Sequence, residues 1–219
     1  MNDVSNNTPT SEDEDDHLDA VESLALVDAQ RREVRTQLDA DFTKIYAAWG
    51  LAWALGMGLA YLVLLGAIPV STNTAFLPFF VLGILAVVVT VGTVTRAERG
   101  LRRAHGHGAR FGAVWALPFA VVGLFAARAP AHGFEIEHVG LVIGILSSLI
   151  VAVIYLVQGA LEHISTMYWI GVMLIVAVAV GIIVGGDEFV LVQATVGGAA
   201  FLVGAGYNHR ARTTIGGTQ

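Results

Sequence analysis

The sequence predicts an all-α integral membrane protein with six transmembrane helices, preceded by a cytoplasmic amphipathic helix. The chain of 219 residues is 55% hydrophobic and 14% charged, with a mean hydropathy of +0.69, whereas soluble domains carry about 25% charged residues. Its apolar residues gather in runs long enough to cross a bilayer core, which takes about 20 residues per helix. These runs lack the alternation typical of a transmembrane β-barrel, so we expect helices throughout the membrane.

The region before the first apolar run divides into two parts. Residues 1–17 contain the acidic stretch SEDEDD and few apolar residues, so we expect a disordered tail that stays in solution. Residues 18–43 carry an apolar stripe of Leu24, Val27, Val34 and Leu38 at helical spacing. We expect this amphipathic helix to dock on the membrane surface or on a cytoplasmic partner; the alternative is a solvated helix leading into the first span.

The transmembrane domain is predicted to occupy residues 44–207, followed by a cytoplasmic tail at 208–219. The fourth and fifth spans come from one apolar stretch that is far too long for a single crossing and must reverse near Glu162 and His163. The six predicted spans are 45–68, 75–95, 111–127, 139–161, 166–185 and 189–207.

The basic residues predict the orientation of the chain. With six spans, all of the 12 Lys and Arg residues except Arg128 fall on the side that also holds both termini. The positive-inside rule places that side in the cytoplasm, here of a bacterial inner membrane. The loop between the second and third spans is therefore expected to anchor the topology through Arg96, Arg99, Arg102, Arg103 and Arg110. Aromatic residues agree with this orientation, because four tryptophans fall near predicted cytoplasmic ends, where indole rings favour the head-group level: Trp49, Trp53, Trp115 and Trp169.

Small residues recur every four positions on several spans. Such ladders let helix backbones approach closely inside a membrane. The ladders on the first and fourth spans are the longest, and we expect packing contacts, within one chain or within a homo-oligomer, at Ala52, Gly56, Gly140 and Gly144.

Polar residues inside the spans are the candidate functional positions. No ionisable group lies near the middle of a span, so the candidates are the neutral residues Ser148, Gln158 and Gln193. Gln193 lies about one turn inside the sixth span, where it serves either a function or, more commonly, a hydrogen bond between helices.

Several classes of site are not expected. The chain has no cysteine, which excludes disulfides and thiolate ligands. His105 and His107 lie in a Gly-rich loop without the further ligands that a metal needs. The only lysine, Lys44, has no neighbouring glycine to form a phosphate loop, and no aromatic residue interleaves the arginines as in a nucleic-acid site. We therefore expect no enzyme, no cofactor and no nucleic-acid partner.

The junction ALVDAQRREVRTQLDADFTKIYAAWGLAWALGMG, followed by six spans, resembles small uncharacterised membrane proteins of actinobacteria. Such proteins are often labelled transporters or ABC permease-like proteins. The resemblance implies a transporter or permease-like subunit that works with a separate ATPase. The alternative is a non-catalytic membrane protein that docks a cytoplasmic partner through residues 18–38.

The topology is tested by reporter fusions that distinguish the two sides of the membrane. A fusion after Asn73 is expected to report the outside, and a fusion after Gly106 the inside, because the arginines of the second loop hold it in the cytoplasm. Matching signals from the two fusions would contradict six spans with cytoplasmic termini.

Overall fold

The computed structural model describes residues 24–25, 41–97 and 107–216, and the region from Asp41 onward forms one compact unit. In these described ranges the regular secondary structure is helical, and six helices are long and apolar enough to cross a membrane. The predicted class of an all-α protein with six transmembrane helices is therefore confirmed. The predicted acidic tail and nearly all of the predicted amphipathic helix lie outside the described residues.

Two of the six spans are built from three helical segments each. The first span consists of α2 (Phe42–Leu51), the π-helical segment η1 (Ala52–Met57) and α3 (Gly58–Leu64). The sixth span consists of α8 (Glu188–Val192), the π-helical segment η4 (Gln193–Gly197) and α9 (Gly198–Gly216).

The other four spans are single α-helices. They are α4 (Leu77–Ala97), α5 (His107–Arg128), α6 (Ile136–Leu161) and α7 (Ser165–Val184). Short 3-10 turns, η2 (Thr72–Thr74) and η3 (Ala129–His132), precede α4 and α6. Between α6 and α7 the chain reverses through Glu162 and His163, and His163 adopts a left-handed φ of 55°.

The ends of several helices differ from the predicted limits. Helix α5 begins at His107 and α6 at Ile136, where the predicted spans begin at 111 and 139. The first span begins at Phe42 and ends at Leu64, so residues 65–68 lie beyond it, and Gly66 turns the chain with a φ of 76°. The sixth span continues to Gly216, so most of the predicted tail at 208–219 is helix. Hydropathy marks where lipid contact ends, whereas a helix ends where its hydrogen bonds stop, and no proline interrupts 208–216.

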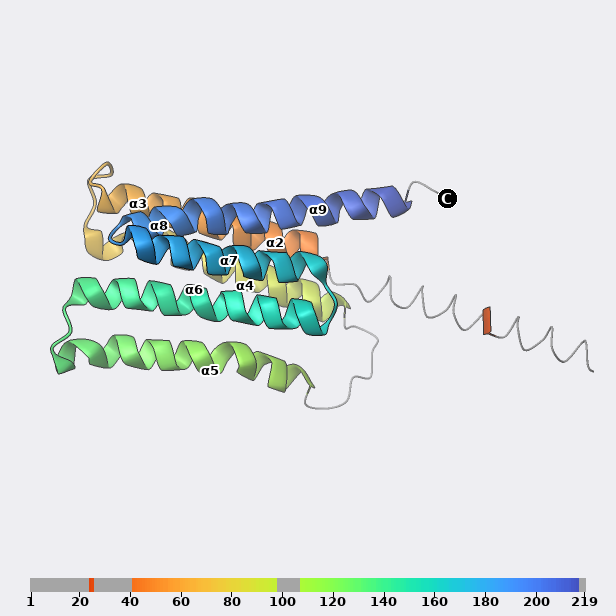
Figure 1. Ribbon diagram of the computed structural model, residues 1–219, viewed down its shortest axis with the longest axis horizontal. Coiled ribbons are helices and arrows are strands. Elements are labelled where there is room, and N and C mark those ends of the chain that lie inside the picture. Colours follow the sequence, from red (N-terminus) through yellow and green to blue (C-terminus); the bar gives the residue numbers. More distant parts are fainter. Residues whose placement is uncertain (1–23, 26–40, 98–106, 217–219) are drawn as a thin grey trace, which may run out of the picture. The chain divides into compact units, whose positions relative to one another are not determined.

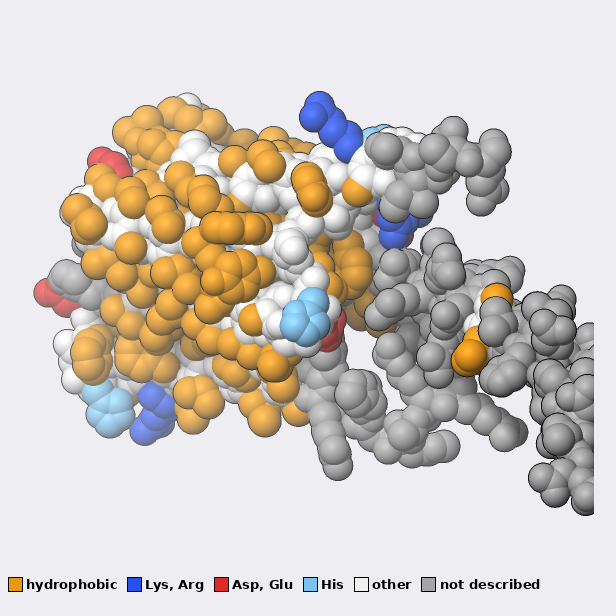
Figure 2. Space-filling model, turned by 45° about the vertical axis from the view of Figure 1, so that its right-hand side comes forward, with side chains coloured by type: hydrophobic (Ala, Val, Ile, Leu, Met, Phe, Trp, Pro, Cys, Tyr) orange, Lys and Arg blue, Asp and Glu red, His pale blue; other side chains and the backbone are white. Residues whose placement is uncertain are grey.

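The spans pack in the order 2–1–6–5–4–3, so the first span lies beside the last (Figure 1). Spans 1, 4, 5 and 6 supply the buried residues of the main core cluster. Spans 2 and 3 lie at the periphery: 6% and 11% of their apolar windows are buried, against 50% for span 6. Figure 2 shows one face of this unit, where hydrophobic side chains cover the middle and charged side chains lie toward the ends.

Aromatic rings occupy the centre of the main core. Tyr155 packs edge-on against Phe201 at 5.3 Å between ring centroids and lies 6.2 Å from Tyr46. The ring of Trp53 lies 5.9 Å from that of Phe201 and is only 3% exposed. The predicted interfacial position of Trp53 is therefore wrong, because this residue lies midway between Phe42 and Leu64 and faces the sixth span.

Glycines permit the closest approaches between backbones. A Cβ at Gly171 of α7 would lie 2.5 Å from the backbone nitrogen of Leu156 in α6, and Gly159 likewise abuts the backbone of Tyr168. Between spans 1 and 2, a Cβ at Gly56 would lie 2.6 Å from the Cα of Phe79. In lipid the hydrophobic effect does not drive helices together, so van der Waals contact at this range holds them instead.

The ring of Phe189 lies between two glycines from different spans. A Cβ at Gly181 of α7 would lie 2.5 Å from this ring, and a Cβ at Gly144 of α6 would lie 3.1 Å from it. Phe189 is 3% exposed. The start of span 6 is thereby fixed against spans 4 and 5, one turn before Gln193.

Side-chain hydrogen bonds join neighbouring spans in the described part of the chain. The indole nitrogen of Trp49 donates to the hydroxyl of Thr90 in α4 at 3.1 Å, and Thr90 donates to the carbonyl of Ala86 at 2.8 Å. The hydroxyl of Thr166 in α7 donates to the amide oxygen of Asn208 in α9 at 3.2 Å. Polar links of this kind strengthen helix pairs in membranes by about 1 kcal/mol.

The close contact at Gly56 predicts a position-specific loss of stability. Gly56→Leu forces the backbones of spans 1 and 2 apart, which we expect to destabilise the folded chain by about 1–3 kcal/mol. The measurement is the melting temperature of the purified protein in detergent. Gly140→Leu is the matched control, because Gly140 is exposed and a Cβ there would meet no described atom within 4 Å. Equal melting temperatures for the two variants would show that Gly56 is not a packing position.

Candidate functional site

The two π-helical segments contact each other across spans 1 and 6. Segment η4 packs against η1 on one side and against α7 on the other. A π turn breaks the regular hydrogen bonding of an α-helix and occurs frequently at functional sites. Two such turns in contact, in spans far apart in the sequence, single out this part of the bundle.

Gln193 is the polar residue of this contact. It is the first residue of η4, its exposed fraction is 0%, and neither its amide nitrogen nor its amide oxygen has a hydrogen-bond partner among the described residues. A buried polar group left without a partner costs about 1–3 kcal/mol. Most buried polar groups are paired, so an unpaired one calls for an explanation such as a functional role.

Trp53 covers the next turn of the same segment. A Cβ at Gly197 would lie 2.6 Å from the Trp53 ring and 3.5 Å from Oε1 of Gln193. Only glycine therefore lets the edge of the indole reach the backbone of span 6 beside the Gln193 amide. Gly198 has a similar role, since a Cβ there would lie 2.9 Å from the backbone nitrogen of Ala54. We name Gln193, Trp53 and Gly197 together the amide site.

The other two predicted polar positions both lie on α6. Ser148 is buried in α6, with 3% of its surface exposed. Gln158 is half-buried near the end of α6, where its carbonyl accepts the backbone N–H of Glu162. A hydrogen bond between helices is the commoner explanation for a glutamine inside a span. The amide of Gln193 has no such partner among the described residues.

The predicted packing residues divide into two groups. Ala52 has an exposed fraction of 0%, Gly56 contacts Phe79, and Gly144 contacts Phe189. Gly140 lies on an exposed part of α6 and has no described neighbour within 4 Å of its would-be Cβ. A repeat of four in a continuous helix drifts around the helix surface, which explains why one end of a ladder leaves the interface.

The arginine loop lies largely outside the described residues. Arg96 is exposed near the end of α4, and Arg110 falls in the first turns of α5. Arg99, Arg102, Arg103 and His105 belong to the range that the structure does not describe, so their predicted roles stay predictions. Among the described residues, no group of three or more His, Cys, Asp or Glu side chains could hold a metal ion.

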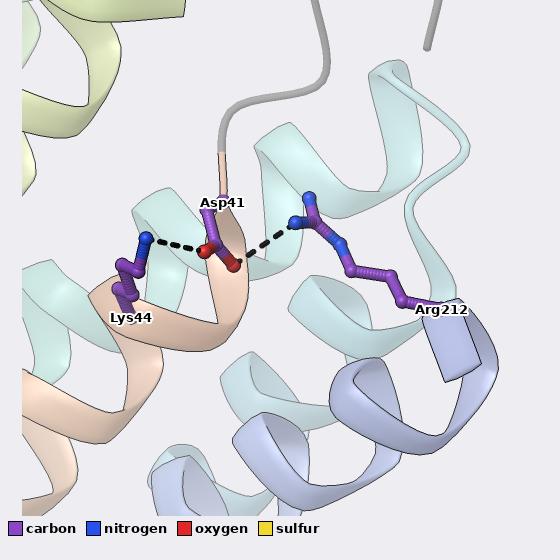
Figure 3. Close-up of polar contacts among 3 residues, drawn as sticks. All are labelled: Asp41, Lys44 and Arg212. Carbon is purple, nitrogen blue, oxygen red and sulfur yellow. Dashed lines mark ion pairs between the residues drawn. The ribbon is translucent and has the colours of Figure 1, made fainter. Parts of the chain in front are cut away.

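A second polar cluster joins the beginning of span 1 to the end of span 6 (Figure 3). The Asp41 carboxylate forms ion pairs with Lys44 Nζ at 3.0 Å and with an Nη atom of Arg212 at 3.1 Å. The Arg212 contact lacks hydrogen-bond alignment, so it acts mainly through charge. Partial burial raises the pKa of Asp41, but the hydrogen bond from Lys44 and the charges of Arg212 and Lys44 outweigh this effect, and its pKa lies below the ordinary 3.8.

A shallow hollow lies beside the turn between α6 and α7, and it is a weaker candidate. Its polar side chains, His163 and Ser165, are exposed to solvent and present no buried group in need of a partner. The amide site is therefore the stronger candidate.

Sequence patterns identified Gln193 but missed its surroundings. Neither π segment has a composition that separates it from the α-helix around it. The available signals were the adjacent glycines Gly197 and Gly198 one turn after a buried amide, and a tryptophan at mid-span. Both are common features of an apolar sequence.

Comparisons with models of protein families, with curated proteins and with solved structures find no match for this chain. The resemblance of the junction to actinobacterial membrane proteins therefore stays a prediction.

The Asp41 cluster predicts a defined pH dependence. Because the pKa of Asp41 is lowered in the folded chain, its carboxylate stabilises the fold at pH values above 3.8, and this contribution is lost as the pH falls through the folded-state pKa. We expect the parent to melt at a higher temperature than Asp41→Asn near neutral pH, and the difference to shrink in strong acid. The melting temperature of the Arg212→Gln variant should change less between neutral pH and strong acid than that of the parent, because the pKa of Asp41 is lowered less without the charge of Arg212. A gap between parent and Asp41→Asn that stays constant down to pH values well below 3.8 would contradict this role.

Proposed function

We propose that the chain is a membrane transport protein that passes a small uncharged solute between spans 1 and 6 by way of the amide site. The observation that supports this proposal is the fully buried, unpaired amide of Gln193 between two π-helical segments. Transporters commonly form their substrate sites where spanning helices are irregular. Irregular backbone within a membrane is tolerated where protein encloses it, and Gln193, Ala194 and Gly197 of η4 are buried.

The distribution of charge limits the means of driving transport. Within the six spans, Asp, Glu, Lys, Arg and His occur only near the ends. An ion-coupled transporter usually has an ionisable group inside the membrane, where it marks the ion pathway. The proposed transport is therefore driven by the solute gradient, or by a separate ATPase if the chain is a permease-like subunit.

The proposed setting is a bacterial inner membrane, with both termini in the cytoplasm. It rests on the side-specific distribution of Lys and Arg residues. Ion pairing between Asp41 and Arg212 agrees with the two ends of the spanning region lying on one side. Docking of a cytoplasmic partner through residues 18–38 stays a prediction, because that segment lies outside the described residues.

Solute flux into proteoliposomes tests the proposed function. Vesicles containing the purified chain are exposed to a hyperosmotic step of an uncharged solute such as acetamide, and reswelling is followed by light scattering. We expect reswelling faster than in protein-free vesicles for uncharged solutes, and no acceleration for acetate or for ammonium ions. Acetate and ammonium ions also control for leakage caused by the protein itself, because a nonselective leak would pass them as well.

The contrary result is also defined. If the parent accelerates no solute, and no ATPase co-purifies with the chain from native membranes, the transport proposal is wrong. Co-purification of another cytoplasmic protein would then favour the docking function.

A further inference from the structure

We infer that the amide site is a binding site for a small planar uncharged ligand of the carboxamide or urea class. The role of this ligand as a transported solute rests on the proposed function. Binding of this ligand can be measured without transport.

The hydrogen-bonding capacity of Gln193 defines the first requirement. A carboxamide offers two N–H donors and an oxygen with two lone pairs. Both the nitrogen and the oxygen of this side chain are buried and lack partners in the described part of the chain. A ligand that satisfies both must itself carry an acceptor and a donor on neighbouring atoms, as in the paired hydrogen bonds between two amides. Acetamide and urea meet this requirement, whereas a ketone or an ether supplies only the acceptor.

The lack of nearby charge defines the second requirement. The neighbours of Gln193 along span 6, Phe189, Val190 and Ala194, belong to an apolar core cluster, and Gly197 and the Trp53 ring lie beside its oxygen. None of these side chains carries a charge that could balance a charged ligand. A lone ion buried in such surroundings is strongly disfavoured. Acetate and alkylammonium ions are therefore excluded, although they resemble acetamide in size.

Trp53 closes the site. The Cε3–Cζ3 edge of its indole lies against Gly197, beside the turn that carries the Gln193 oxygen. The planar form of the ligand follows from the two hydrogen bonds in one plane that the Gln193 amide can make. The site is closed in this structure, since Gln193 is 0% exposed and Trp53 is 3% exposed. A ligand enters when the indole leaves Gly197, and the space of the ring then becomes the space of the ligand.

The two polar clusters of the bundle differ in this respect. Asp41 already holds Lys44 and Arg212, so its charge is balanced within the chain. Gln193 has equal need of partners and none among the described side chains.

Ligand-dependent thermal stability tests the inference with the full-length chain in detergent. Acetamide is the probe, and a ligand that binds the folded state raises the melting temperature in a saturable way. We expect such a rise for the parent and for the control Gln158→Met. We expect none for Gln193→Met, and at least a tenfold higher apparent Kd for acetate than for acetamide.

The variant without ligand gives a second readout. Methionine has about the size of glutamine but needs no hydrogen bond. Gln193→Met is therefore expected to melt at or above the temperature of the parent, because it removes an unpaired amide. A clear fall in melting temperature would show that Gln193 is bonded within the protein, and would overturn the inference.

Binding and transport can fail separately. If the parent shows no saturable rise with acetamide, the inference is overturned, whatever the proteoliposomes show. Saturable binding that depends on Gln193, together with no flux, supports the site and rejects the transport proposal. Flux that is unchanged in Gln193→Met supports transport and rejects the site.

Discussion

Contact between helix backbones is the constraint on which this bundle depends. Lipid tails are as apolar as the side chains, so burial of apolar surface alone does not hold spans together. The spans meet where glycine removes the side chain, as at Gly171 against Leu156 and at Gly56 against Phe79. Spans 1, 4, 5 and 6 form the core through such contacts and a shared aromatic centre, and spans 2 and 3 cover its edges.

The same constraint explains the position of the amide site. The π segments of spans 1 and 6 come into contact because Gly197 and Gly198 admit Trp53 and Ala54 to the backbone of span 6. The same two glycines bring the backbone of span 1 close to the turn of Gln193, whose amide has no hydrogen-bond partner among the described residues.

Sequence reasoning predicts the number of spans well and their details less well. Hydropathy determines where a helix meets lipid, so six spans and the reversal near Glu162 follow directly from the apolar runs. The extension of α9 to Gly216 does not follow, because hydrogen bonding continues after the apolar run ends. Trp53 shows a second limit: an interfacial and a buried tryptophan look alike until the neighbouring helix is known. Gln193 could be singled out by its type and place, but its lack of partners depends on the residues that span 1 brings to it.

The side-by-side position of spans 1 and 6 has a consequence for biogenesis. Span 1 leaves the ribosome first, but its main partner, span 6, is synthesised last. Until then, Gly50 and Trp53 on the core face of span 1 lack the span 6 residues that pack against them, whereas Tyr46 can already meet Tyr155 of span 4. Spans 4 and 5 pair before span 6 is made, so the core forms in stages and is complete only when span 6 is in place. An interruption of synthesis before Glu188 leaves a membrane-inserted chain with an exposed aromatic face, which cellular quality control can recognise as unfinished.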